Sequence, residues 1–125
     1  MATSDSIRSY KDLNVWKLGM DLAEAAYKHT AGFPREEAFG MTAQIRRAAA
    51  SIPANIAEGY GRENTGAYIQ FLRIAQGSLK ELETHLMLAE RVGLLTSEPK
   101  TKLLDQAESI SKMLRNLIRS LQAST

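Results

Sequence analysis

Residues 65–92 read TGAYIQFLRIAQGSLKELETHLMLAERV, and the apolar residues of this stretch recur at alternating spacings of four and three. The same alternation runs through residues 97–122. Such spacing keeps one seam of a helix facing a nearly parallel neighbour, as in coiled coils and helical bundles. We therefore expect two long helices that pack side by side. Their seams comprise Tyr68, Leu72, Ala75, Leu79, Leu82, Leu86 and Ala89 in the first and Leu103, Ala107, Ile110, Leu114, Leu117 and Leu121 in the second.

Two further helices are predicted nearer the N-terminus. They cover about residues 13–30 and 34–58, the latter interrupted at Gly40. Asp12 and Ser97 each precede a helical stretch and are of the residue types that cap a helix N-terminus. Because the connections between the helices are short, neighbours must run antiparallel. The sequence thus predicts an all-α fold, an antiparallel up-down-up-down four-helix bundle.

The predicted bundle spans residues 10–122, between a disordered N-terminal tail at residues 1–9 and a C-terminal tail at residues 123–125. Within its second helix, Pro53 lacks an amide donor and crowds the carbonyl four positions earlier, so we expect a kink there. Gly59 is predicted to end this helix in a left-handed conformation.

The composition supports a helical fold and narrows the classes of function. Of 125 residues 44% are apolar, and 17 Ala and 15 Leu against 2 Val favour helix over sheet. The absence of cysteine excludes a disulfide scaffold. Neither His29 nor His85 follows a Glu by three positions, the spacing of metal sites in bundles, so we predict no metal and no cofactor. No stretch is apolar enough to span a membrane, and we expect a cytoplasmic location.

The first two helices carry more apolar surface than one bundle can cover. In the first helix the apolar arc is about two-thirds of the circumference, whereas a surface helix needs little more than about 100°. The second helix has a face of alanines, which either admits a second backbone or reflects only the helix propensity of alanine. Together the two helices predict a self-association surface. The predicted interface residues are Val15, Leu18, Leu22, Ala43, Ala50, Ala54 and Ala57.

A polar stripe on the second helix is one candidate for binding. It includes Arg47, Asn55, Glu58 and Arg62, and Arg46 lies beside it. One interpretation is an anion or RNA surface, because arginine forks suit phosphate groups. The other is structural, with Glu58 paired to Arg62 and Asn55 bonded across the kink. Both interpretations stay open at the level of sequence.

Basic residues on the last two helices are the second candidate. Lys112, Arg115 and Arg119 share a stripe of the fourth helix. Arg73, Lys80 and Arg91 share a face of the third, which Glu83 and Glu90 flank. A structural interpretation is complementarity to the helix dipole. A functional one is an RNA-binding patch whose field grows when an oligomer repeats it, although the net charge of +2 is too small to prove a polyanion partner. The predicted nucleic-acid contacts are Arg46, Arg47, Arg62, Lys112, Arg115 and Arg119.

Three stretches of the sequence resemble a known family. They read YKDLNVW at residues 10–16, QIRRAAASIPANIAEGYGR at residues 44–62 and FLRIAQGSLKELE at residues 71–83. They resemble the four-helix bundle proteins encoded in intervening sequences of bacterial 23S ribosomal RNA, and the accessory variability proteins of diversity-generating retroelements. The resemblance covers about residues 10–122. It implies a pentameric barrel of bundles and, for the retroelement branch, a reverse transcriptase partner and nucleic-acid binding through a positively charged surface.

These observations lead to one hypothesis and one alternative. The hypothesis is a non-enzymatic, cytoplasmic homo-oligomer, pentameric by resemblance, that serves as an RNA-associated accessory or scaffold protein. The alternative is a protein-protein interaction module that binds no nucleic acid and docks a partner through its apolar and alanine faces. No catalytic residue and no small-molecule substrate is predicted.

Overall fold

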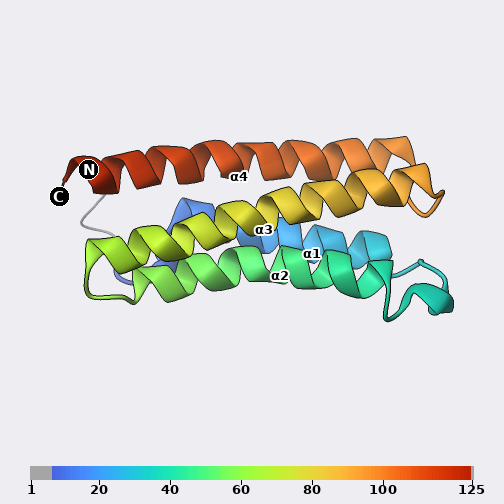
Figure 1. The fold of residues 1–125 in the computed structure, drawn as a ribbon, viewed down its shortest axis with the longest axis horizontal. Helices are drawn as coiled ribbons and strands as arrows, with labels where there is room; N and C mark the ends of the chain where they lie inside the picture. The colour runs from blue at the N-terminus through green and yellow to red at the C-terminus, as the bar shows by residue number, and fades with distance from the viewer. Residues whose placement is uncertain (1–6, 125) are drawn as a thin grey trace.

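A computed structural model describes residues 7–124. Its helices are α1 (Asn14–Thr30), α2 (Met41–Tyr60), α3 (Thr65–Arg91) and α4 (Ser97–Ala123), with single 3-10 turns at Tyr10–Asp12 and Arg35–Glu37 (Figure 1). No strand occurs in this part of the chain. The separate turn at Arg35–Glu37 confirms the predicted interruption near Gly40. Most of the expected N-terminal tail, residues 1–6, and Thr125 lie outside the described residues.

The four helices form the predicted antiparallel bundle. Each helix packs against its neighbours along the chain, and α4 also packs against α1, which closes the bundle (Figure 1). The helices therefore stand at the corners of a square, with the pair α1 and α2 on one side and the pair α3 and α4 on the opposite side. None of the described helices has a stretch apolar enough to cross a membrane.

The core is built from the predicted seams, with one shift at the end of α4. In α3 the seam from Leu72 to Ala89 is fully buried, while Tyr68 is only half-buried. In α4, Ile118 is buried in place of the predicted Leu117, which is half-buried. Ile118 follows Leu114 by four positions, so the buried stripe continues here at a spacing of four where the sequence pattern predicts three.

The buried stripe of α1 corrects part of the predicted interface. Val15 is 5% exposed and Leu22 is fully buried in the bundle core, so neither can contact a second copy. They belong to a stripe with Gly19 between them. A Cβ on Gly19 would lie 3.5 Å from the Cβ of Pro53, so the absence of a side chain lets α1 pack against the proline of α2.

Gly59 does not end α2, contrary to the prediction. The helix continues to Tyr60, and Gly93 after α3 is the glycine with a positive φ among the described residues. Gly59 is buried, and a Cβ there would lie 2.8 Å from the Cβ of Phe71. Glycine is therefore required at this position because α2 and α3 approach closely.

The predicted helix caps are also corrected. Leu13 is the N-cap of α1 and Thr96 that of α4, so Asp12 and Ser97 are not the cap residues. The Asp12 carboxylate instead accepts hydrogen bonds from the backbone amides of Arg8, at 2.8 Å, and Ser9, at 3.2 Å. These two amides hold the pKa of Asp12 below its usual value, because they stabilise the carboxylate form.

Candidate functional site

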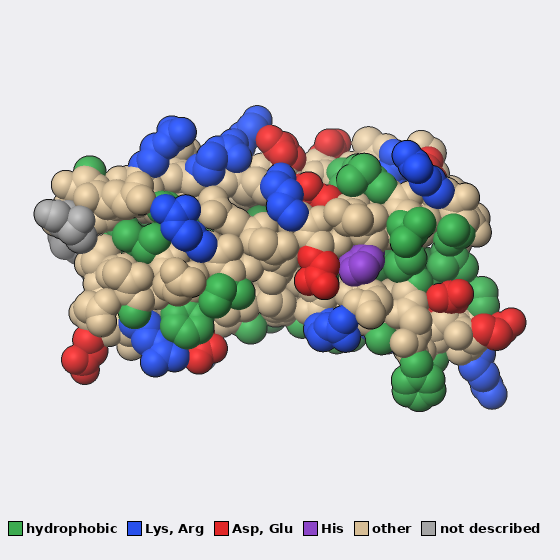
Figure 2. All heavy atoms as spheres, in the orientation of Figure 1, with side chains coloured by type: hydrophobic (Ala, Val, Ile, Leu, Met, Phe, Trp, Pro, Cys, Tyr) green, Lys and Arg blue, Asp and Glu red, His purple; other side chains and the backbone are tan. Residues whose placement is uncertain are grey.

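A positively charged surface lies where α3 begins and α4 ends. Residues 65–80 of α3 and 109–123 of α4 contain no Asp or Glu. Figure 2 shows Lys and Arg side chains gathered over this half of α3 and α4. We call this the α3–α4 basic surface, and it consists of the exposed residues Arg73, Lys80, Lys112, Arg115 and Arg119.

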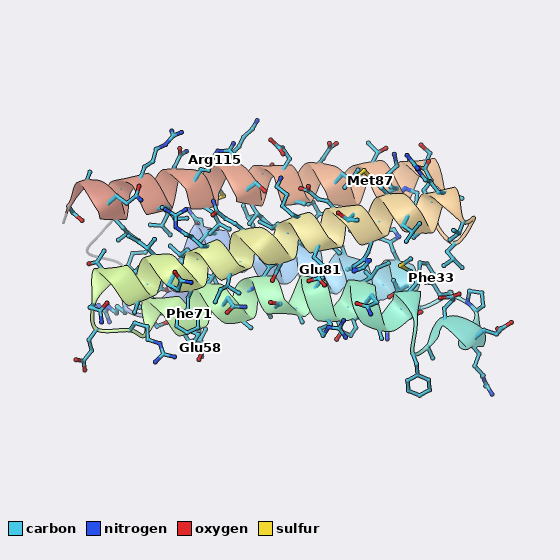
Figure 3. All side chains as sticks on the ribbon, in the orientation of Figure 1. Phe33, Glu58, Phe71, Glu81, Met87 and Arg115 are labelled. Carbon is cyan, nitrogen blue, oxygen red and sulfur yellow. The ribbon has the colours of Figure 1, made fainter. Side chains whose placement is uncertain are left out.

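Most cations of this surface have no partner within the chain. Arg73, Lys112, Arg115 and Arg119 form no ion pair or side-chain hydrogen bond with any other described residue. Lys80 forms an ion pair of 3.4 Å with Glu83. Arg115 lies on α4 in this half of the bundle (Figure 3). Since little negative charge is nearby, the surface attracts anions.

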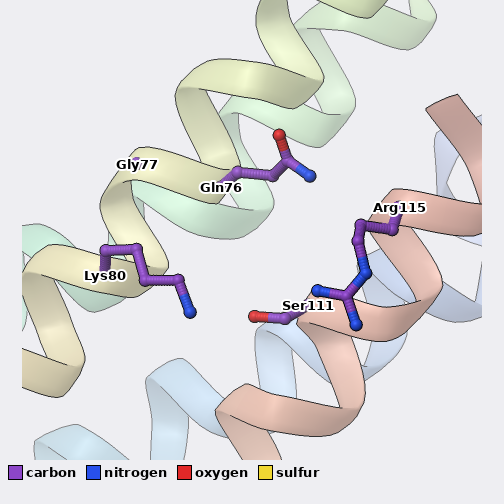
Figure 4. A pocket seen from close by; sticks show the side chains of 5 residues that line it. All are labelled: Gln76, Gly77, Lys80, Ser111 and Arg115. Atoms are coloured by element: carbon purple, nitrogen blue, oxygen red, sulfur yellow. The ribbon is translucent and has the colours of Figure 1, made fainter.

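A pocket of about 300 Å³ opens within the α3–α4 basic surface, between the two helices. It is lined by Gln76, Gly77, Lys80, Ser111 and Arg115 (Figure 4). Gly77 contributes no side chain, and a Cβ built there meets no atom within 4 Å. The pocket therefore combines two cations with a hydroxyl and an amide.

Arg46, a predicted nucleic-acid contact on α2, is engaged in the fold. Its Nε donates to the hydroxyl of Thr30 at 2.9 Å, and its Nη2 donates to the carbonyl of Tyr27 at 3.2 Å. The guanidinium also lies 4.6 Å from the centre of the Tyr27 ring. Arg46 thus ties α2 to the C-terminal turn of α1, where the Tyr27 carbonyl also accepts a hydrogen bond of 3.1 Å from the Thr30 hydroxyl.

Arg47 and Arg62 also make contacts within the chain. Arg47 donates a hydrogen bond to the side chain of Gln44. Arg62 pairs with Glu58 at 2.9 Å and lies 4.7 Å from the centre of the Phe71 ring. Figure 3 shows Glu58 and Phe71 at the end of the bundle where α2 leads into α3. The predicted ion pair between Glu58 and Arg62 is therefore present.

The rest of the polar stripe on α2 faces α3. Ser51 shares a hydrogen bond of 2.7 Å with Ser78, and Asn55 donates to the carbonyl of Ser51 at 2.8 Å. Asn55 thus bridges from one side of Pro53 to the other, as the structural interpretation expects. These contacts favour a structural role for the stripe.

The basic residues predicted on α4 are therefore joined by Arg73 and Lys80 of α3, while Arg46, Arg47 and Arg62 lie elsewhere. The sequence placed Arg73 and Lys80 on one helix face but not among the contact residues. Both facing half-helices lack acidic residues, and this pattern would have indicated that Arg73 and Lys80 belong with the basic residues of α4.

An apolar groove of about 390 Å³ lies on the opposite side of the bundle, along α1 and α2. Of the predicted interface residues, Ala50, Ala54 and Ala57 line it. Leu18 is 39% exposed but lines a separate depression beside α4, and Ala43 is half-buried. The complete lining of the groove is Tyr10, Trp16, Met20, Ala23, Ala50, Pro53, Ala54 and Ala57.

The histidines take no part in either surface. His85 lies 3.8 Å from Glu81, and its Nε2 is buried without a hydrogen-bond partner. Within residues 7–124 no group of three His, Cys, Asp or Glu side chains is placed to hold a metal ion. Tyr68 is half-buried between α2 and α3, and this burial raises the pKa of its phenol, because the anion is poorly solvated there.

Comparison with known proteins identifies relatives of this chain. A family model described as 23S rRNA-intervening sequence protein matches residues 11–116. A solved structure from Bacteroides thetaiotaomicron, of a protein with unknown function from the S23 ribosomal protein family, is 28% identical. It superposes with a TM-score of 0.75 over 83% of this chain and 97% of that one. Comparison with curated proteins finds no significant match.

Proposed function

This chain belongs to the family of 23S rRNA-intervening sequence proteins, and we propose that it is a non-enzymatic, self-associating bundle that binds the RNA backbone as an accessory or scaffold protein. The α3–α4 basic surface is the binding site in this proposal, and the apolar groove along α1 and α2 is the contact between copies. The resemblance described above suggests five copies.

The observation that carries RNA binding is the concentration of positive charge, most of which is unpaired. The chain has a net charge of only +2, yet the α3–α4 basic surface gathers five cations with no acidic residue in either half-helix. Phosphate contacts by Lys and Arg release counterions, so affinity falls as salt rises. Contacts to phosphate groups require no side chains that recognise base edges. Two helices that carry only Lys and Arg side chains at this surface can therefore make them.

The position of the apolar groove supports self-association. Because the helices stand at the corners of a square, the groove along α1 and α2 faces away from the α3–α4 basic surface. Copies that meet through the groove keep their basic surfaces outward and exposed to RNA. An assembly then presents the same positive surface several times, which multiplies the local field.

The test is the salt dependence of RNA binding. A single-stranded RNA oligonucleotide is titrated with the protein at several salt concentrations, by fluorescence anisotropy. In the test variant, Arg73, Lys112 and Arg119 are all replaced by Gln, which spares the pocket. We expect the slope of log K against log salt to fall by about 2, since each phosphate contact on a single strand contributes roughly 0.7.

The matched control removes three exposed cations elsewhere, with Lys17→Gln, Arg35→Gln and Lys102→Gln. The control should lower the affinity much less than the test variant. Equal effects of the two triple variants, or no binding at low salt, would overturn the RNA proposal. A lack of RNA binding at low salt, together with an intact assembly, would instead favour the protein-protein interaction module that docks a partner through the groove.

A further inference from the structure

Ser111 is a buried polar residue without a partner. The structure has three buried polar residues within residues 7–124, Thr30, Ser78 and Ser111. Thr30 donates to the carbonyl of Ala26 at 2.8 Å, and Ser78 bonds to Ser51 at 2.7 Å. Ser111 is 5% exposed and forms no hydrogen bond to another described residue. Although the residue is buried overall, its hydroxyl opens into a pocket and is free to bond water or a ligand there.

The free hydroxyl lies in the pocket within the α3–α4 basic surface. In Figure 4 the Lys80 ammonium and the Arg115 guanidinium lie on either side of the Ser111 hydroxyl, and Gln76 lies above them. No carboxylate lines the pocket, and the nearest acidic partner is Glu83, which contacts Lys80 at 3.4 Å. Two cations thus line the pocket, and only Lys80 has a carboxylate within ion-pair distance.

We propose that this pocket binds a terminal phosphate monoester, such as the 5′-phosphate of an RNA strand or of a free nucleotide. A monoester carries a charge between about −1.5 and −2 and has three free oxygens. The guanidinium fork of Arg115 suits two of these oxygens, and the Lys80 ammonium suits the third. Ser111 and Gln76 supply neutral donors at the same place.

A backbone phosphodiester matches the pocket less well. It carries one negative charge and two free oxygens, so it leaves one of the two cations unmatched. The pocket volume of about 300 Å³ is at the lower end of the range for small-molecule sites. The inference rests on the proposed function for RNA as the source of the phosphate, while a free nucleotide would supply the same chemistry.

The experiment compares two RNA oligonucleotides of one sequence, one with a 5′-phosphate and one with a 5′-hydroxyl, each labelled at the 3′ end. Fluorescence anisotropy measures both affinities for the full-length protein. We expect the 5′-phosphate to raise the affinity about tenfold, and adenosine 5′-monophosphate to compete for the gain. An affinity ratio near one overturns the proposal.

Two pairs of variants locate the effect in the pocket. Gly77→Glu places a carboxylate in the pocket and should abolish the preference for the 5′-phosphate, whereas Gly77→Ala should retain it. Both variants should fold, because a Cβ at Gly77 meets no atom within 4 Å. Arg115→Gln should also abolish the preference. Lys112→Gln removes the same charge outside the lining and should weaken both RNAs equally. A preference that survives Gly77→Glu in the folded protein overturns the assignment.

The outcomes separate this inference from the proposed function. Equal binding of the two RNAs overturns the pocket assignment and leaves backbone binding intact. Binding of adenosine 5′-monophosphate that Gly77→Glu abolishes, without binding of either RNA, supports the pocket and overturns the RNA function. Absence of binding by both RNAs and by the mononucleotide overturns both.

Discussion

Gly59→Ala is expected to destabilise the bundle, although alanine is normally the better residue inside a helix. A Cβ at this position would lie 2.8 Å from the Cβ of Phe71 and 3.2 Å from the carbonyl oxygen of Tyr68. Neither atom is the end of a flexible side chain, so neither can retreat without a movement of the α3 backbone. The new methyl group must therefore push α2 and α3 apart.

Two free-energy terms of opposite sign decide the result. Replacement of a helical glycine by alanine stabilises by roughly 0.5–1 kcal/mol. An extra methyl group in a packed contact costs about 1–3 kcal/mol, and the rigid neighbours of Gly59 favour the upper end. The expected net loss is about 2 kcal/mol. Gly77→Ala is the matched control, because its Cβ meets nothing within 4 Å and only the stabilising term acts.

The two variants should therefore differ by about 3 kcal/mol in their free energies of unfolding, or roughly 10 °C in Tm. Circular dichroism of urea and thermal unfolding measures the difference. Wild type and variants are compared at one protein concentration, because self-association makes Tm depend on concentration. If Gly59→Ala proves as stable as Gly77→Ala, the close approach of α2 and α3 does not explain the glycine.

Further variants test the groove, the N-terminal turn and the arginine contacts. Ala54→Glu puts a charge in the apolar groove, and light scattering and circular dichroism should show a helical monomer. The control Thr101→Glu, at an exposed position of α4, should stay assembled. An assembled Ala54→Glu variant would show that the groove is not the interface. Because the pKa of Asp12 is lowered in the folded protein, its carboxylate stabilises the fold fully at pH values above the ordinary aspartate pKa of about 4. This contribution is lost as the pH falls through the lowered pKa. Fluorescence of Trp16, whose ring centre lies 5.3 Å from that of Tyr10, should report this acid transition, and Asp12→Asn should lack it. Arg46→Ala should lower the free energy of unfolding by about 1–2 kcal/mol, because it removes two hydrogen bonds and a ring contact. If the stability is unchanged and the RNA affinity falls strongly, Arg46 is instead an RNA contact.

The sequence predicted the helices well, because helix formation depends on local spacing and on nearby breakers. The ends of α1, α3 and α4 lie within one or two residues of the prediction. Val15 and Leu22 were misplaced because the apolar arc of α1 is wide, and periodicity alone does not show which part of the arc faces the core. Gly59 was misassigned for a related reason, since its neighbours Tyr68 and Phe71 come from α3.

The pocket could not be predicted from either helix alone. Lys80 and Arg115 are 35 positions apart, and they share a site only because the connection from α3 to α4 fixes how the two antiparallel helices align. The free hydroxyl of Ser111 depends on the same alignment. Local periodicity contains no information on this register, whereas it does place Lys112, Arg115 and Arg119 on one stripe of α4.

Self-association and RNA binding can be tested together, because they use opposite sides of the bundle. An RNA long enough to reach several copies should bind the assembly with a steeper salt dependence than one chain can produce. The five cations of one α3–α4 basic surface limit the slope for a single chain to roughly 3.5, at about 0.7 per contact on a single strand. Wild type should exceed this slope on the long RNA, and Ala54→Glu should not. On an RNA that spans one chain only, the two proteins should agree, because Ala54 lies on the far side from the basic residues. If Ala54→Glu is monomeric and still gives the wild-type slope on the long RNA, RNA binding gains nothing from assembly, and the scaffold function proposed here is wrong.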